Sequence, residues 1–244
     1  AHPIHTEVVA NIKSRDEIVS FLFLCLMLFF LFRFVRTQKA KFMFFSILCY
    51  ITALLSKENG ITFIAIIPLA LFFFAKKSIK QSFLLTLPFL IAAGIYLAVR
   101  TSLVGMIGDR ESNDITDNPF LSLNFPDLPT AIPFIDKLAT ISWILLKYLL
   151  LLIFPHPLTS DYGFNQIPII SFSDPKAVAS VLVYVGLFSY AVMTWMKEIK
   201  IRNKPEARSQ KPESLLLSFS ILYFVTTISI VSNIFFLIGT TMGE

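Results

Sequence analysis

Titratable side chains gather in short segments that interrupt long apolar runs. The first segment is residues 2–17, HPIHTEVVANIKSRDE, which holds two histidines, two glutamates and an aspartate directly before an uncharged run. Carboxylates can take the proton of an acceptor hydroxyl, and cations can hold the phosphate of a leaving group. These residue types therefore favour a transfer reaction on a phosphorylated substrate at a membrane surface. An ordinary solvated loop is the alternative for the same segment.

A second polar segment, Ser56-Lys57-Glu58-Asn59-Gly60, separates two short apolar runs. An ionisable residue at membrane depth is costly and usually functional, so Lys57 and Glu58 are candidates for a site. The Asn-Gly pair is also a strong turn signal, so a plain turn is the competing interpretation.

Candidate site residues follow from these segments and from the other polar loops. The candidate catalytic carboxylates are Glu7 and Glu58, and Asp16 is a further carboxylate of the same kind. No spacing of ligands requires a metal, although the carboxylates could bind a divalent ion. The candidate substrate-binding residues are polar residues expected on one face of the membrane: His2, His5, Lys57, Arg100, His156, Asp161 and Glu244.

The composition predicts an all-α integral membrane protein. The 244 residues are 55% hydrophobic, include 26 phenylalanines and have a mean hydropathy of +0.72. The apolar residues form unbroken blocks, whereas soluble domains alternate apolar with polar positions. Only helices or closed barrels can cross a bilayer, and these blocks favour helices. We expect a multi-span helical bundle with about six full spans: 17–32, 42–55, 61–75, 82–99, 176–196 and 214–238.

The distribution of charge predicts which ends of the helices face the cytoplasm. The connectors 33–41, 76–80 and 197–213 hold 13 of the 21 basic residues and 3 of the 16 acidic ones, and such an excess marks cytoplasmic loops. The other polar segments are then expected on the outer face, which leaves the apolar run 138–154 between two outer loops. We therefore expect an interfacial or re-entrant helix there, with Lys147 at the membrane surface. The expected outer loops are 1–16, 100–137 and 155–175.

Several function classes have no support in the sequence. The motifs GxxxxGK[ST], HExxH and CxxC are absent, which removes the usual signals of nucleotide, zinc-protease and redox chemistry. The basic residues cluster between apolar runs, so they indicate topology rather than nucleic-acid binding. Cys25 and Cys49 lie inside apolar runs and are expected to be small core residues. The chain begins without Met and ends just after an apolar run, so we expect one membrane domain truncated at both ends.

Five motifs in order resemble the transmembrane and tetratricopeptide-repeat (TMTC) family of O-mannosyltransferases. They are HPIHTEVVANIKSRDE, LLSKENGITF, DNPF, FPHPLTSDYGFNQIPII and GTTMGE. The likeness covers nearly the whole chain, and its most specific parts are the His-Pro-x-His-Thr-Glu and Ser-Lys-Glu blocks. The family is similar in fold to the C-type glycosyltransferase (GT-C) superfamily.

The resemblance implies a glycosyltransferase that uses a lipid-linked sugar. The expected donor is mannose on a polyprenyl or dolichyl phosphate, and the expected acceptor is a Ser or Thr hydroxyl of a protein. The resemblance also implies a catalytic aspartate upstream of Ala1 and repeats after Glu244, so this piece is not expected to be active alone. By the same likeness His2, His5 and Glu7 match the first-loop motif of the family.

Two other hypotheses remain open. A transporter or flippase for a lipid or polar solute would suit broken helices, but it needs polar groups near the midplane, and the charges here gather on one face. A non-catalytic membrane scaffold is the third hypothesis. The high content of Phe, Lys and Ile favours a bacterial inner membrane, and the endoplasmic reticulum would be the site in a eukaryote.

Overall fold

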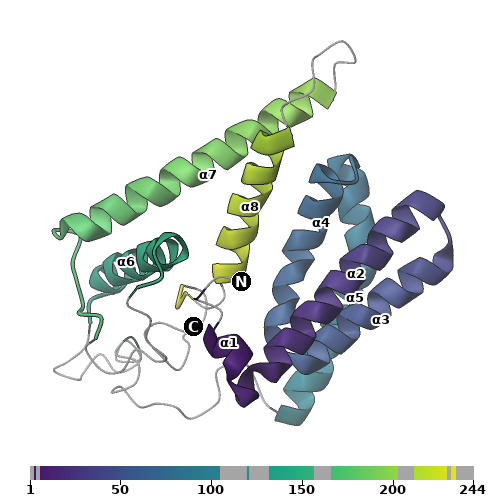
Figure 1. The fold of residues 1–244 in the computed structure, drawn as a ribbon, viewed down its shortest axis with the longest axis horizontal. Coiled ribbons are helices and arrows are strands. Elements are labelled where there is room, and N and C mark those ends of the chain that lie inside the picture. The colour runs from purple at the N-terminus through teal and green to yellow at the C-terminus, as the bar shows by residue number, and fades with distance from the viewer. Residues whose placement is uncertain are drawn as a thin grey trace. The chain divides into compact units, whose positions relative to one another are not determined.

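The computed structural model describes residues 3, 6–104, 120, 132–156, 166–202, 212–229 and 232–234. All regular elements in these ranges are helices, which confirms the predicted all-α class (Figure 1). The chain divides into two compact units. We call them the α2–α5 unit, Thr6–Ile107 with Arg208–Thr226, and the α6–α7 unit, Ala1–His5 with Gly108–Ala207 and Thr227–Glu244.

The α2–α5 unit begins with α1 (Thr6–Ala10) and a short 3-10 helix, η2 (Ile12–Ser14). Its long elements are antiparallel neighbours that short connectors join, as Figure 1 shows. Most of one further helix, α8 (Pro212–Ile228), also belongs to this unit. The long elements are α2 (Arg15–Thr37), α3 (Ala40–Ser56), α4 (Phe63–Phe73) and α5 (Ile79–Val104), and a short 3-10 helix, η3 (Glu58–Thr62), lies between α3 and α4.

The core of this unit lies between α2, α3, α4 and α5 and is almost entirely apolar. Met27, Tyr50, Ile66 and Phe89 are fully buried in it. Two serine hydroxyls also join α2 to α3: Ser20 Oγ donates to Ala53 O at 3.1 Å, and Ser46 Oγ donates to Met27 O at 2.8 Å. Hydrogen bonds of this kind hold neighbouring helices together in lipid.

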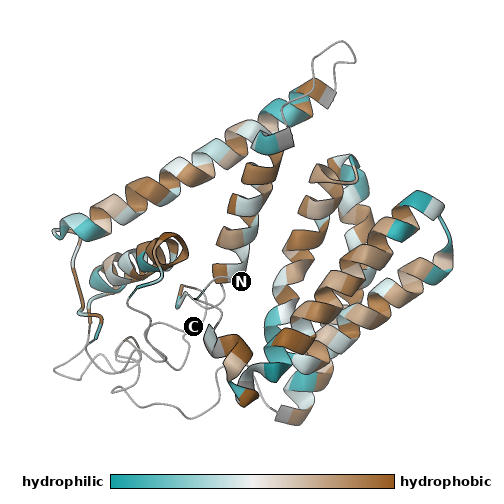
Figure 2. Cartoon of the chain, in the orientation of Figure 1, coloured by the Kyte–Doolittle hydropathy of each residue, from teal (hydrophilic) through white to brown (hydrophobic). Residues whose placement is uncertain are grey.

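The outward faces of the same helices are also apolar. Phe29, Phe44, Phe83 and Ile91 are among the exposed large side chains on α2, α3 and α5. Figure 2 shows apolar colour along the middle of these helices and hydrophilic colour near their ends. An apolar exterior with polar ends is what a helix needs to lie in a bilayer.

The α6–α7 unit contains α6 (Phe134–Ile153) and α7 (Pro175–Arg202). Tyr184 Oη of α7 donates to the carbonyl of Leu145 at 2.8 Å. Thr140 of α6 accepts a hydrogen bond from Ile170 N at 3.0 Å, which fastens the segment before α7 to α6. Lys137 is buried, and its ammonium lies 5.9 Å from the Phe120 ring centroid. Burial lowers the pKa of Lys137.

Among the residues that the structure describes, three helices are long and apolar enough to cross a membrane: Arg15–Thr37, Ile79–Leu103 and Pro175–Ile201. The expected spans 42–55, 61–75 and 214–238 correspond to shorter apolar helices, Ala40–Ser56, Glu58–Phe73 and Glu213–Ile228. Six full crossings and the interfacial position of 138–154 therefore stay predictions.

Several predicted boundaries differ from those of the structure. Arg100 was expected in the outer loop 100–137 but lies in α5, because the backbone hydrogen bonding of the helix continues to Val104 past the end of the apolar run. α8 ends at Ile228, well before the predicted 238, and residues 232–234 beyond it are not helical.

Candidate functional site

Lys57 and Glu58 lie at the corner where α3 ends and η3 begins. Lys57 is extended, with φ −148° and ψ 127°, so the α-helix stops at Ser56 and η3 starts at Glu58. Gly60 is buried behind this corner, and a Cβ atom there would lie 3.5 Å from Ser20 Oγ. The corner therefore packs against the first turns of α2.

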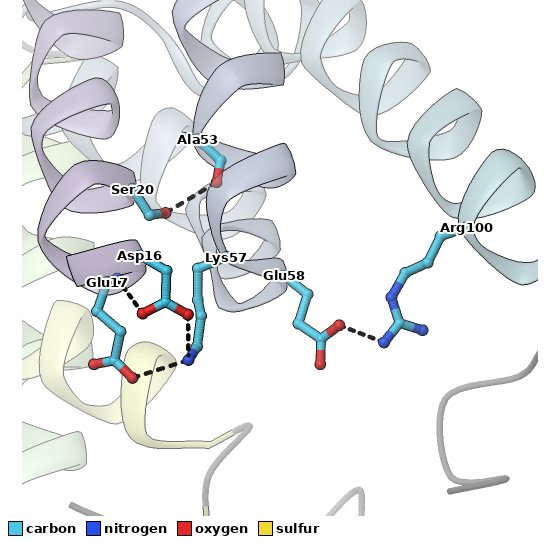
Figure 3. A network of polar contacts seen from close by, with 7 residues as sticks. All are labelled: Asp16, Glu17, Ser20, Ala53, Lys57, Glu58 and Arg100. Carbon is cyan, nitrogen blue, oxygen red and sulfur yellow. Dashed lines mark hydrogen bonds and ion pairs between the residues drawn. The ribbon is translucent and has the colours of Figure 1, made fainter. Parts of the chain in front are cut away.

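The ammonium of Lys57 lies between two carboxylates from the first turn of α2 (Figure 3). Its Nζ is 3.1 Å from Asp16 Oδ2 and 3.2 Å from Glu17 Oε1. Asp16 Oδ1 also accepts a hydrogen bond from Glu17 N at 2.8 Å. Burial alone would lower the pKa of Lys57, but its hydrogen bonds to Asp16 and Glu17 and their charges together raise that pKa. Lys57 is therefore a firmly charged link between α2 and the corner.

Glu58 pairs with a residue of α5, whereas Lys57 pairs with residues of α2. Arg100 of α5 donates from Nη2 to Glu58 Oε2, as Figure 3 shows. The Arg100 side chain is only 11% exposed, whereas Glu58 is 45% exposed. The Arg100 side chain is thus largely buried, while the carboxylate that pairs with it is exposed to solvent.

These contacts make one polar cluster at one end of the α2–α5 unit. Three carboxylates and two cations come together from α2, the α3–η3 corner and α5. A guanidinium can bind two oxygens of a phosphate in its planar fork, which a single ammonium cannot do. Chemically, the cluster can hold an anion at Arg100 and can offer a carboxylate at Glu58 for proton transfer.

The structure thus brings together three of the predicted site residues, Lys57, Glu58 and Arg100. His156 lies in the α6–α7 unit, where it is exposed and its ring is 6.2 Å from that of Phe154. For Glu7 the structure gives only the backbone, in α1. The remaining candidates lie outside the described residues: His2, His5, Asp161 and Glu244.

The pairing of Lys57 with Asp16 and Glu17 was not predicted from the sequence. A signal was present, because a short connector makes α2 and α3 antiparallel and so brings the start of α2 beside the end of α3. Within the described residues no group of three or more His, Cys, Asp or Glu could hold a metal ion.

Comparison with known proteins supports the resemblance of the chain to the TMTC-type family. Residues 125–188, which include α6 and His156, match the family model described as "Protein O-mannosyl-transferase TMTC, DUF1736". The chain is 28% identical over 246 residues to a protein O-mannosyl-transferase from Caenorhabditis elegans, and this match covers 100% of the chain. The chain spans 30% of the length of that relative. No solved structure matches the chain.

Proposed function

We propose that this chain, a relative of the TMTC-type protein O-mannosyl-transferases, is part of the membrane domain of a glycosyltransferase. The observation that carries the proposal is the match over the whole chain to a protein O-mannosyl-transferase. The proposed reaction moves a sugar, with mannose expected, from a polyprenyl or dolichyl phosphate to a Ser or Thr hydroxyl of a protein. The three apolar helices agree with a donor that is held in a membrane.

The cluster at the α3–η3 corner suggests a distinct role for each cation. Lys57 already faces two carboxylates, so an added phosphate would meet net negative charge there, and we assign Lys57 a positioning role. Arg100 faces one carboxylate, and a phosphate could replace that carboxylate without changing the sign of the local charge. Arg100 is therefore our candidate for binding the donor phosphate.

Glu58 is then the candidate base among the described residues. When the donor phosphate binds the guanidinium of Arg100, the ion pair between Arg100 and Glu58 breaks. The free Glu58 carboxylate can then accept the proton of the acceptor hydroxyl. The hydroxyl oxygen forms a bond to the anomeric carbon as the bond from that carbon to the phosphate oxygen breaks. The lipid phosphate leaves with the electron pair, and Arg100 stabilises its charge.

The test uses the full-length protein, a polyprenyl-phosphate mannose and a Ser/Thr-rich acceptor peptide. We expect transfer by the wild type and a loss of about 10²-fold or more in kcat for Glu58→Gln, the usual contribution of a general base. Arg100→Met should raise KM for the donor and also lower kcat, because the guanidinium both binds the phosphate and stabilises the charge that develops on it as it leaves. Lys80→Gln, which removes an exposed cation at the opposite end of α5, is the control and should keep full activity.

Each failure has its own meaning. If the wild type transfers no lipid-linked sugar, the transferase function is wrong, and the transport hypothesis is the next to test. If transfer persists in both site variants, the protein is an enzyme but its site does not include the corner cluster.

A further inference from the structure

The end of the α2–α5 unit away from Lys57 is strongly basic. Two segments lie there: residues 33–41, which include the end of α2, the turn and the start of α3, and residues 76–80, which lead from the turn after α4 into α5. Together they carry seven basic residues and no acidic one. All of these basic side chains except the half-buried Lys77 are exposed: Arg33, Arg36, Lys39, Lys41, Lys76 and Lys80.

Two of these cations lie at the same aromatic ring. Arg33 Cζ of α2 is 5.5 Å from the centroid of Phe42, and Lys41 Nζ of α3 is 5.3 Å from it. Within the described residues no carboxylate pairs with either cation. Attraction to one ring contributes only about 0.5–1 kcal/mol at an exposed site, and the two like charges repel each other. An anion bound by both would remove that repulsion.

Hydrogen bonds of Gln38 hold the turn between α2 and α3. Gln38 has φ 55°, and its Nε2 donates to Val35 O at 2.9 Å, so the glutamine side chain satisfies a terminal carbonyl of α2. The backbone N–H of Gln38 donates to Phe34 O at 2.7 Å. Because the glutamine caps the helix, the basic side chains are not needed for that role.

We propose that Arg33 and Lys41, together at the Phe42 ring, bind the phosphate headgroup of an anionic phospholipid. The neighbouring helix surfaces favour a lipid over a soluble anion, because Phe44 and Phe45 next to the site are exposed and apolar. Clusters of basic residues at the end of an apolar helix bind anionic lipids in this way. The proposal concerns the opposite end of the unit from the corner cluster and does not depend on the transferase function.

Native mass spectrometry of the purified full-length protein in detergent can measure this binding. Phosphatidylglycerol is the probe, phosphatidylcholine is the neutral comparison, and inorganic phosphate is the soluble anion. We expect the wild type to bind phosphatidylglycerol more tightly than phosphatidylcholine. Arg33→Gln/Lys41→Gln should weaken phosphatidylglycerol binding about thirtyfold, the product of two charges that contribute about 1 kcal/mol each.

A matched control removes the same charge elsewhere. Arg15→Gln/Lys176→Gln alters two exposed cations at other helix ends and should change the affinity less than twofold. Equal weakening by both double variants would overturn the proposal, as would equal binding of the two lipids or full competition by millimolar phosphate. Phe42→Leu keeps every charge and decides the question if the double variant does not fold: we expect severalfold weaker binding, and an unchanged affinity would refute a site at the ring.

Discussion

Replacing Lys57 with methionine tests whether its two ion pairs fasten the start of α2 to the end of α3. The nearer carboxylate oxygen lies 3.1 Å from Nζ. At that separation and an effective dielectric constant of about 20, one pair has a Coulomb energy of about 5 kcal/mol. Water screens much of this, because Lys57 is 30% exposed and Asp16 and Glu17 are each 39% exposed.

The expected net effect is therefore well below the Coulomb energy. Exposed ion pairs contribute about 0.2–1 kcal/mol, and hydrogen bonds to charged groups contribute about 1.5–3 kcal/mol. We expect Lys57→Met to lower the free energy of unfolding by about 1–2 kcal/mol. Part of this loss comes from the two carboxylates left without a cation, so Lys57→Met/Asp16→Asn/Glu17→Gln should recover most of it.

Thermal unfolding of the full-length protein in detergent micelles provides the assay. A change of 1 kcal/mol shifts Tm by about 2–4 °C in a domain of this size, so the single variant should unfold several degrees below the wild type. Lys80→Met removes an exposed lysine that has no ion pair within the described residues, and it should leave Tm unchanged. The reasoning fails if Lys57→Met behaves like this control, or if the triple variant is no more stable than the single one.

Two further substitutions probe the packing of each unit. Tyr184→Phe removes the hydrogen bond to the Leu145 carbonyl, at a cost of about 1 kcal/mol, so amide exchange in α6 should become faster while exchange in the α2–α5 unit stays the same. Tyr50→Phe removes a buried hydroxyl that has no hydrogen-bond partner in the described part of the chain and keeps the edge-to-face contact with Phe89 at 5.7 Å. Because an unpaired buried hydroxyl is unfavourable, Tm should stay the same or rise, and a clear decrease would argue that the hydroxyl does have a partner.

The existence of the helices could be predicted from the apolar runs, but their ends could not. The run 82–99 predicted α5 correctly as a long helix, yet the helix extends from Ile79 to Val104. The difference arises because a window of apolar residues stops at Lys80 and Arg100, whereas helical backbone hydrogen bonding continues through charged residues. For the same reason Arg100 was expected in a loop, whereas it lies in the last turns of α5.

At the α3–η3 corner, too, the sequence indicates the candidate residues but not their partners. Lys57 and Glu58 stand out in the sequence because ionisable residues between two apolar runs are unusual, and Arg100 stands out at the end of another run. Their charges are compatible with several pairings, including a direct pair between Lys57 and Glu58. Which of these ion pairs forms depends on which helix ends pack beside the α3–η3 corner.

Residue types and the lengths of the apolar runs therefore established a helical membrane protein with acidic and basic residues at the ends of its helices. The tertiary packing determines which ion pairs form. The antiparallel packing of α2 and α3 brings Asp16 and Glu17 to Lys57, and the packing of α5 in the same unit brings Arg100 to Glu58. The physical reason is that ion pairing acts over a few ångströms, so residues 41 or 42 positions apart can pair only after the apolar faces of the helices have packed.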